Sequence, residues 1–476
     1  MKARHTRRFI AALAFVTLSG SLVACGSDSD SDSTDKSKTT EATDAKTGTV
    51  EGALKVPEDF ETIQAAVDAA ESGDLIIVGE GTYEEAVDVE TDDITIRGVD
   101  RNKVILDGGF ELENGIRILD ADGVVVENMT ARNYVSNGFF WTGSDRYRGS
   151  YLTAYRNGDY GVYAFDAYHG QFDNSLGSGS PDAGFYIGEC FECDAVIDNV
   201  ISEYNGLGYS GTNSGGEVYI VNSTFRYNRA GIVPNSGSYE LCYPGRANTI
   251  VGNIVHDNNN ADAPAISVAL LAQGNGILMA GSINNVIERN LVYDHDRTGI
   301  AAVPFPEEDA SDVPPAADTL ETPCEDTRDN EMPDPDTIPS LVIWHPSGNT
   351  IRDNIVSGSG LGDLASATID DDTFTSKTLD NCFSGNTFDK SAPLDIEELA
   401  PCDGEGSDGD WSANALDLLV LITKMAPEPP KDTYQKMPEP GDQPNMPDAD
   451  TAPAVRFEAP VRPDLDAIKV PARPAE

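Results

Sequence analysis

The sequence is poor in positive charge and in histidine. Its 476 residues include 32 Lys and Arg against 81 Asp and Glu, which gives a formal net charge of −49, and only five residues are His. Such an acidic surface repels nucleic acid and anionic lipid headgroups, so neither is an expected partner. A polyanionic polysaccharide is disfavoured for the same reason, unless Ca²⁺ ions or a local basic patch offset the field. The composition does not require a cofactor, and Ca²⁺ is the one cofactor that it leaves open.

The chain also has few long apolar runs, and the first of them follows a basic N-terminus. The run 9–24 is shorter than the roughly 20 residues that a membrane-spanning helix needs. It ends in Leu-Val-Ala-Cys-Gly, which resembles the lipobox of bacterial lipoproteins. We therefore expect residues 1–24 to be a signal peptide, Cys25 to carry a lipid, and the Ser- and Asp-rich residues 25–50 to form a flexible tether. The alternative is an ordinary secretory signal. The lipid would be the protein's only attachment to the bacterial cell membrane, on its extracytoplasmic side.

Six cysteines remain besides Cys25. They are Cys190, Cys193, Cys242, Cys324, Cys382 and Cys402. An even number in an exported protein predicts up to three disulfides, and all fifteen pairings stay open. The Cys190 and Cys193 spacing is that of a redox or zinc half-site, but no second such pair is present, which favours a small disulfide loop.

Glycines at a fixed interval predict the fold. Gly115, Gly138, Gly161 and Gly184 are each 23 residues apart, and each opens a short run with β-type residues. A repeat of this length with short strands fits one coil of a solenoid in which each coil bonds only to its neighbours. We predict an all-β, right-handed parallel β-helix over residues 51–400, and a monomer.

A set of asparagines precedes short apolar runs at related spacings. They are Asn128, Asn174, Asn199, Asn222, Asn253, Asn290, Asn354 and Asn386. We expect their side chains to stack from coil to coil as a single buried ladder, because amides can hydrogen-bond along the axis.

The ends of the solenoid need covers. Residues 57–72 read as an amphipathic helix that caps the first coil, and residues 401–426, which include a helix at 411–425, are expected to cap the last one. Residues 307–339 are rich in Pro, Asp and Glu and are predicted to be an inserted loop. The Pro-rich residues 427–476 are expected to form an extended tail that returns along the solenoid.

The N-terminal helix, the strand 74–78, the Gly-Thr-Tyr turn at 81–83 and the 23-residue coils resemble the pectate-lyase-like β-helix superfamily. More narrowly, residues 157–163 and 180–189 resemble a bacterial family of exported β-helix repeat proteins, although Glu189 and Cys190 replace that family's usual Gln-Ser. The resemblance implies the fold. The sequence has neither the Asn-Thr-Asp and Gly-His-Gly motifs of polygalacturonases nor the Asp-Pro-His-Glu motif of alginate epimerases.

One row of residues is predicted to point outward at coil spacing. It comprises Arg117, Phe140, Tyr163, Tyr186 and Tyr209. Exposed aromatic rings spaced by one coil would stack on the sugar rings of a carbohydrate polymer. The alternative is that the rings shield the strands or lie under the C-terminal tail.

Charges are segregated beside this row, and they supply the catalytic candidates. These are Arg146, Arg148 and Arg156 on the basic side, with Asp166, His169, Asp182 and Glu189 on the acidic side. Arginine can hold an acidic sugar, and carboxylates can bind Ca²⁺ or transfer protons. The alternative is that these are ordinary solvated side chains, and the metal, if there is one, is not identified. A stacked pair, Asp257 and Asp294, is a further possible metal position. The predicted function is non-catalytic binding of a carbohydrate polymer, and the alternative is a polysaccharide lyase, hydrolase or epimerase.

Overall fold

The computed structural model describes residues 50, 52–316, 319–320, 324, 334, 337–371, 373–423 and 425–474. The predicted signal peptide, the lipidation site Cys25 and residues 25–49 of the tether lie outside these residues, as does part of the predicted insertion 307–339. Within the described residues, no helix is long and apolar enough to cross a membrane.

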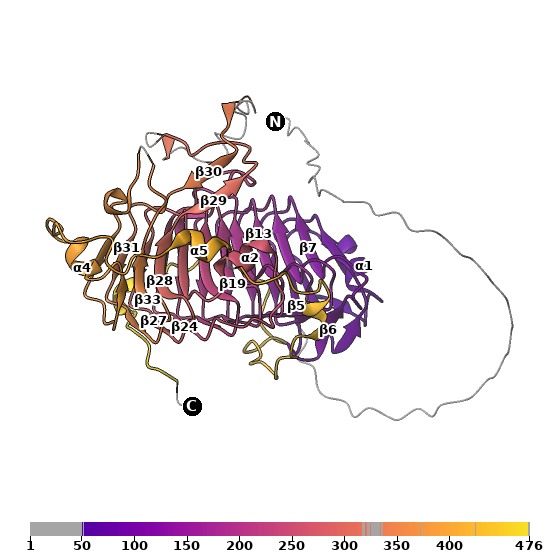
Figure 1. Cartoon of the computed structure of the whole chain (residues 1–476). Helices are drawn as coiled ribbons and strands as arrows, with labels where there is room; N and C mark the ends of the chain where they lie inside the picture. Colours follow the sequence, from indigo (N-terminus) through magenta and orange to yellow (C-terminus); the bar gives the residue numbers. More distant parts are fainter. Residues whose placement is uncertain are drawn as a thin grey trace. The chain divides into compact units, whose positions relative to one another are not determined.

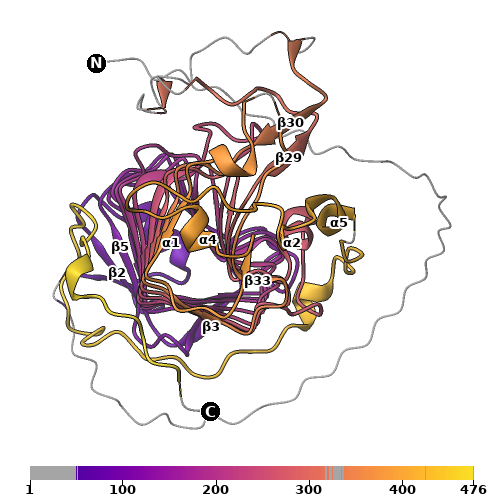
Figure 2. The same ribbon diagram turned by 60° about the vertical axis from the view of Figure 1, so that its left-hand side comes forward.

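Three long parallel sheets wind around one core, as a right-handed parallel β-helix requires (Figures 1 and 2). The 12-stranded sheet contains β1 (Leu54–Val56), β2 (Leu75–Val78), β5 (Thr95–Gly98), β8 (Val125–Glu127), β11 (Arg148–Ser150), β14 (Gly170–Asp173), β17 (Ala195–Asp198), β20 (Gly215–Val221), β23 (Arg246–Val251), β26 (Val286–Glu288), β31 (Thr350–Arg352) and β34 (Cys382–Ser384). The 10-stranded sheet contains β3 (Gly81–Tyr83), β6 (Val104–Asp107), β9 (Thr130–Arg132), β12 (Thr153–Tyr155), β15 (Leu176–Ser178), β18 (Ile201–Glu203), β21 (Thr224–Arg226), β24 (Ile254–His256), β27 (Leu291–Tyr293) and β32 (Ile355–Ser357).

The 11-stranded sheet carries the features that matter for function. It contains β4 (Val87–Val89), β7 (Ile116–Leu119), β10 (Phe139–Thr142), β13 (Tyr160–Phe165), β16 (Ala183–Gly188), β19 (Leu207–Thr212), β22 (Ala230–Asn235), β25 (Ile277–Ala280), β28 (Thr298–Val303), β33 (Gly362–Ser366) and β35 (Ser391–Ala392). Ile116, Phe139, Val162 and Phe185 pair in register at 23-residue intervals and are all buried in the core. The predicted fold and coil length are thereby confirmed.

Short helices close the two ends of the stack. Helix α1 (Ile63–Ala69) begins where the Thr62 side chain accepts a hydrogen bond from the Ala65 amide, and it buries Ile63, Ala66 and Val67 against the first coil. At the other end, α4 (Ile396–Leu399) buries Ile396 and Leu399 and contacts β34. Helix α5 (Leu418–Thr423) does not lie at this end, because its residues line a pocket on the 11-stranded sheet with residues of β22 and β25.

The asparagines form more than one track, so the expectation of a single ladder is wrong. Asn253, Asn290, Asn354 and Asn386 do form a ladder, with side-chain hydrogen bonds of 2.9–3.0 Å from each amide to the next. In the preceding coil, Ser223 occupies this column, because its backbone amide donates to the Asn253 side chain. Asn222 therefore lies one residue earlier, where its positive φ of 49° makes it a turn residue. Asn128, Asn174 and Asn199 share that left-handed conformation.

Three disulfides pair all six candidate cysteines: Cys190 with Cys193, Cys242 with Cys324, and Cys382 with Cys402. The small loop predicted at Cys190 is confirmed. Disulfides persist outside the reducing cytoplasm, so these bonds indicate an extracytoplasmic protein.

Two segments pack on the outside of the solenoid. The antiparallel pair β29 (Phe305–Glu308) and β30 (Leu341–Trp344) flanks the inserted loop, and Trp344 is buried. The C-terminal tail, drawn in yellow in Figure 2, passes along the 12- and 10-stranded sheets. Buried Arg97 donates to the backbone carbonyls of Ala452 and Pro453 in this tail.

Candidate functional site

Four of the five residues predicted to point outward form one row. Arg117 pairs in register with Phe140, Phe140 with Tyr163, and Tyr163 with Tyr186. Tyr209 does not continue the row, and that expectation is wrong. The coil between β16 and β19 has one extra residue, so Tyr209 pairs with the core residue Phe185 and is 0% exposed. A slip of one residue moves a side chain to the other face of a strand.

The aromatic rings pack on one another rather than presenting four open faces. Tyr163 is stacked on Phe140 at 4.6 Å and on Tyr160 at 4.1 Å, so both of its faces are occupied. Tyr186 meets Tyr163 edge-on and is 0% exposed. The expectation that Tyr186 is an exposed ring is therefore wrong. Phe140 and Tyr163 are half-buried, and they are the aromatic members of the row that solvent reaches.

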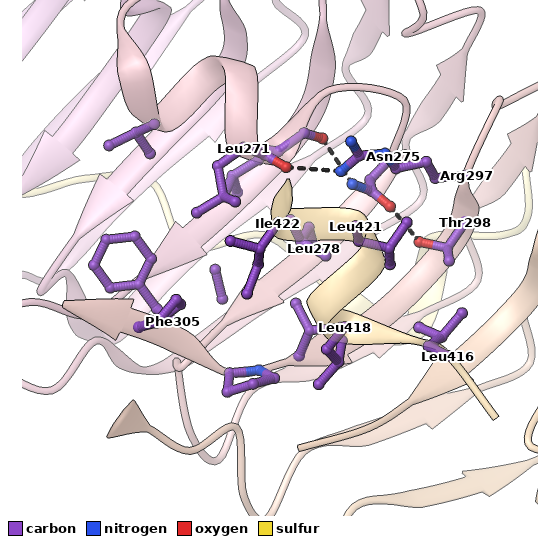
Figure 3. A pocket seen from close by; sticks show the side chains of 17 residues that line it. Leu271, Asn275, Leu278, Arg297, Thr298, Phe305, Leu416, Leu418, Leu421 and Ile422 are labelled. Atoms are coloured by element: carbon purple, nitrogen blue, oxygen red, sulfur yellow. Dashed lines mark hydrogen bonds between the residues drawn. The ribbon is translucent and has the colours of Figure 1, made fainter. Parts of the chain in front are cut away.

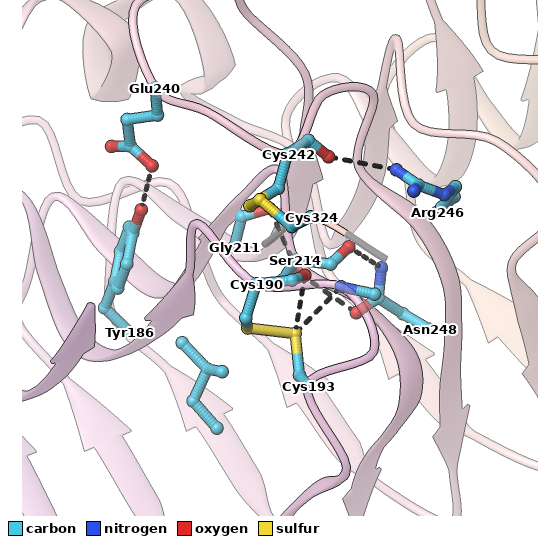
Figure 4. The surroundings of a disulfide bond; sticks show 12 residues. Tyr186, Cys190, Cys193, Gly211, Ser214, Glu240, Cys242, Arg246, Asn248 and Cys324 are labelled. Carbon is cyan, nitrogen blue, oxygen red and sulfur yellow. Dashed lines mark hydrogen bonds between the residues drawn. A yellow bond between two sulfur atoms is a disulfide. The ribbon is translucent and has the colours of Figure 1, made fainter. Parts of the chain in front are cut away.

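Tyr186 is covered by the loop before Cys242, not by the C-terminal tail. Figure 4 shows its hydroxyl pointing at the Glu240 carboxylate, to which it donates a hydrogen bond. Burial raises the pKa of Glu240, and the charges of Glu189 and Asp182 raise it further, while the hydrogen bond from Tyr186 opposes the shift. The loop is held by Glu307, whose carboxylate accepts from the Ser238 amide at 2.8 Å.

Two carboxylates occupy adjacent coils at the start of β13 and β16. The Asp182 amide donates to the Asp159 carbonyl at 3.2 Å, so the two residues are stacked neighbours. Tyr160 donates its hydroxyl to the Asp182 carboxylate. Burial raises the pKa of Asp182 to about 8, helped by the charge of Asp159 and opposed by the Tyr160 hydrogen bond. Burial also raises the pKa of Asp159, to about 6. The pair therefore holds a proton more readily near neutral pH than two free aspartates would.

The three arginine candidates are not brought together at this place. Arg146 forms an ion pair with Asp93 at 3.1 Å. Arg148 lies on β11 of the 12-stranded sheet and pairs with carboxylates on the neighbouring strands. Arg156 follows β12 of the 10-stranded sheet and donates to the Met437 carbonyl of the tail at 2.6 Å. Residues this close in the sequence can lie on different sheets, which is why a basic cluster in the sequence is not one in space.

The three candidate carboxylates lie at opposite ends of strands within the 11-stranded sheet. Asp166 follows β13 and Glu189 follows β16, and the Asp166 amide bonds to the Gly188 carbonyl. Asp182 lies at the opposite end of β16. His169 belongs to the turn before β14, where its Nδ1 contacts the Asp145 carboxylate. The seven predicted catalytic residues therefore do not form one constellation.

Sequence reasoning missed Asp159, Tyr160 and Glu240 as members of the site. The signal for Asp159 was present, because it precedes Asp182 by one 23-residue coil. Glu240 lies in a loop outside the repeat, and nothing in its sequence context places it over Tyr186.

The described residues include no group of three or more His, Cys, Asp or Glu side chains that could hold a metal ion. Asp257 and Asp294 do lie on adjacent coils, since the Asp257 amide donates to the Tyr293 carbonyl. Asp294, however, pairs with Arg473 of the tail at 2.8 Å.

Comparison with known proteins gives one family match. Residues 67–267 match the model of a family described as periplasmic copper-binding protein (NosD). The residues present do not fit copper, which prefers imidazole and sulfur ligands. His169 and His256 are the histidines of the matched range. They lie apart, one in the turn before β14 and one at the end of β24, each beside an aspartate. The cysteines of this range are in disulfides.

Solved structures that resemble the chain include the A-module of mannuronan C-5 epimerase AlgE4 from Azotobacter vinelandii, at 14% identity and a TM-score of 0.47, covering 76% of this chain and 96% of that one. Pectate lyase Pel9A has 12% identity and a TM-score of 0.39, covering 81% of this chain and 84% of that one. Alginate lyase from Paenibacillus sp. str. FPU-7 has 15% identity and a TM-score of 0.35, covering 68% of this chain and 94% of that one. At these scores the likeness says nothing about a site. No curated protein matches the chain.

Proposed function

We propose that this β-helix binds a neutral carbohydrate polymer on the outer face of the 11-stranded sheet, at a surface formed by Arg117, Phe140, Asp159, Tyr163 and Asp182. We name it the aromatic–acid surface. The observation that carries the proposal is that half-buried Phe140, Tyr163 and Asp159 lie on consecutive coils, with the buried carboxyl of Asp182 on the next coil. Coils repeat about every 4.8 Å along the axis. A polymer that follows the axis meets equivalent positions in turn.

The chemistry of the surface favours uncharged sugars. Carboxylates and tyrosine hydroxyls exchange hydrogen bonds with sugar hydroxyls. Arg117 is engaged by Asp88 through two hydrogen bonds of 2.9 Å, so it adds little positive field for an acidic sugar. Among the described residues, Tyr163 is the one ring that stacks on Phe140, and Phe140 is half-buried. We therefore expect a sugar ring to stack at Phe140.

The test is binding of the purified protein to a panel of neutral and acidic polysaccharides. Phe140→Ala should weaken binding of the neutral polymer by roughly 1–3 kcal/mol, by analogy with stacking of bases on aromatic side chains. Tyr204→Ala is a matched control, because Tyr204 also stacks on a ring of the next coil, Tyr227, but follows the 10-stranded sheet. Equal affinity of the Phe140 variant and the unchanged protein for every polymer would contradict the proposal.

A second candidate function, cleavage of the bound polymer, is favoured by the stacking of Asp182 on Asp159, two carboxyls on adjacent coils whose pKa values are raised by burial. A carboxyl with a raised pKa can donate a proton to a leaving oxygen at neutral pH, and an ionised carboxylate beside it can accept a proton from water or sugar. Release of reducing ends by the protein, lost in both Asp182→Asn and Asp159→Asn, would support it. Binding without any product, at all pH values from 5 to 9, would leave binding as the function.

Attachment to the cell membrane through Cys25 is also a proposal, supported by the lipobox-like sequence 22–26. Cys25→Ser should release the protein from the membrane fraction or leave its signal peptide uncleaved. Unchanged membrane association of this variant with its signal peptide cleaved would exclude the lipid anchor.

A further inference from the structure

An apolar pocket lies on the outer face of the 11-stranded sheet, beyond the aromatic–acid surface (Figure 3). Its floor comes from β22, β25 and β28, and its walls come from β29, α5 and α2 (Ser267–Ala272). With α5 in place the cavity has a volume of about 60 Å³, room for a few water molecules. A larger ligand therefore requires α5 to shift outward. All but three of the 17 lining residues are apolar.

The three polar residues are together at one end. They are Asn275, Arg297 and Thr298, shown side by side in Figure 3. The Asn275 side chain is satisfied within the protein, because its oxygen accepts from the Thr298 hydroxyl at 2.6 Å and its nitrogen donates to the Ala272 carbonyl at 2.7 Å. Arg297 is the one charged side chain of the lining. Burial lowers the pKa of its guanidinium.

The partners of Arg297 do not balance its charge. Its Nη1 donates to the Leu271 carbonyl at 2.9 Å, and within the described residues no carboxylate pairs with it. Buried arginines elsewhere in the protein have an ion-pair partner or more hydrogen-bond acceptors. Arg97 is paired with Glu127 at 2.8 Å, and Arg229 donates to two carbonyls and to the Gln273 side chain. A partly buried cation is costly without a counter-ion, so Arg297 favours an anion in the pocket.

Helix α5 covers this pocket. Its sequence is Leu-Leu-Val-Leu-Ile-Thr, and none of its side chains is fully buried. Leu418 and Leu421 line the pocket, whereas Leu419 is 69% exposed. A six-residue helix that buries no side chain completely is displaced at a small free-energy cost. Displacement would widen the entrance without disturbing the coils.

We propose that the pocket binds a long-chain carboxylate, with the alkyl chain between α2, α5 and the sheet and the carboxylate on Arg297. The planar guanidinium matches a carboxylate in a two-point contact. A single cation balances one negative charge, so a monoanionic head fits better than a phosphate dianion. Each buried CH₂ group adds to the affinity, which makes the apolar walls its main source. This ligand site is independent of the proposed carbohydrate binding.

The test is a calorimetric titration of the full chain with dodecanoate below its micelle concentration. We expect saturable binding of one molecule per chain, with dodecanol and dodecyl phosphate each bound at least tenfold more weakly. Arg297→Gln should weaken dodecanoate binding at least tenfold. The absence of saturable binding, an unchanged affinity of Arg297→Gln, or tighter binding of either of the other two compounds would overturn the proposal.

A pair of variants on α5 tests the place of the alkyl chain. Leu421→Asp puts a charge into the pocket and should abolish binding, whereas Leu419→Asp puts the same charge on the exposed side of the same helix and should leave the affinity within twofold. Melting curves of both variants show whether the fold is retained. Equal effects of the two substitutions on affinity would exclude this pocket as the site.

Discussion

The outer face of the 11-stranded sheet differs between its first and second halves. From β7 to β16, register partners are separated by one regular coil, and the outer positions carry a row of large side chains that includes Phe140 and Tyr163. Beyond β22 two coils are much longer, since Ile232 pairs with Ile277 and Ile300 pairs with Leu364, while the coil between them keeps the regular length. The additional residues form α2, β29 and β30, which pack on the outer face. Uninterrupted coils thus leave a face accessible, and interrupted coils supply their own cover.

The largest effect should come from Tyr186, where the two halves meet. Tyr186→Ala should lower the free energy of unfolding by about 3–5 kcal/mol, because it removes a fully buried ring and leaves Glu240 without its hydroxyl partner. Urea unfolding followed by circular dichroism measures this. Tyr186→Phe retains the ring and is the control for the hydroxyl alone. A loss of less than about 1 kcal/mol in Tyr186→Ala would mean that Tyr186 belongs to the accessible half.

The next effect concerns the disulfide between Cys242 and Cys324, which ties the cover of the second half. Replacing both cysteines with Ser should destabilise the protein by about 2–4 kcal/mol, since the bond closes a loop with a sequence separation of 82. The same change at Cys190 and Cys193, separated by 3, should have a smaller effect because the loop is short. Denaturant midpoints of the two double variants give the comparison. A larger loss at the short loop would contradict this account.

Stability should fall as the pH rises through the range in which Asp182 titrates. Its pKa is raised from 3.8 to about 8 in the folded protein, so the folded state holds a proton that the unfolded state has released. Stability from this proton is present at low pH and is lost as the pH rises from about 4 to about 8. Asp182→Asn should make the decline shallower in urea melts recorded across this range. Asp159 and Glu240 shift in the same direction, so a residual slope remains.

The smallest effect on stability should be that of Phe140→Ala, in the accessible half. The ring is half-buried and packs on Tyr163, and its loss should cost about 1 kcal/mol. Differential scanning calorimetry measures the shift. A cost as large as that of Tyr186→Ala would mean that both halves are core, and the proposed binding surface would lose its main support.

The sequence was sufficient to predict the fold, because a solenoid repeats the same pattern of glycines and β-type residues in every coil. The glycine period placed four outward residues in the correct register, and the Cys190 loop followed from the spacing of its cysteines. The 23-residue period assigned residues to the wrong face where a coil changed length. One extra residue before Tyr209 directs its side chain into the core. A one-residue offset likewise divides the asparagines into separate tracks.

The candidate site was predicted in part only. The row of aromatics was visible in the sequence, but its cover was not, because Glu240 comes from a loop whose path depends on the Cys242 disulfide and on the buried Glu307. The arginines were misleading for another reason. Each coil passes through all three sheets, so charges that are close in sequence, such as Arg148 and Arg156, lie on different faces of the solenoid.

The hold of Arg97 and Arg101 on the tail has a consequence for the order of events during synthesis. Both guanidinium groups belong to the early coils, yet each donates to a tail carbonyl more than 340 residues later in the chain, on Ala452 and Pro444 respectively. These contacts of the first coils therefore form only after the tail has been synthesised. Because the arginines bind main-chain carbonyls, the side chains of Ala452 and Pro444 contribute little to this closure. The amino-acid sequence of the tail can therefore change as long as its backbone keeps the same path along the solenoid.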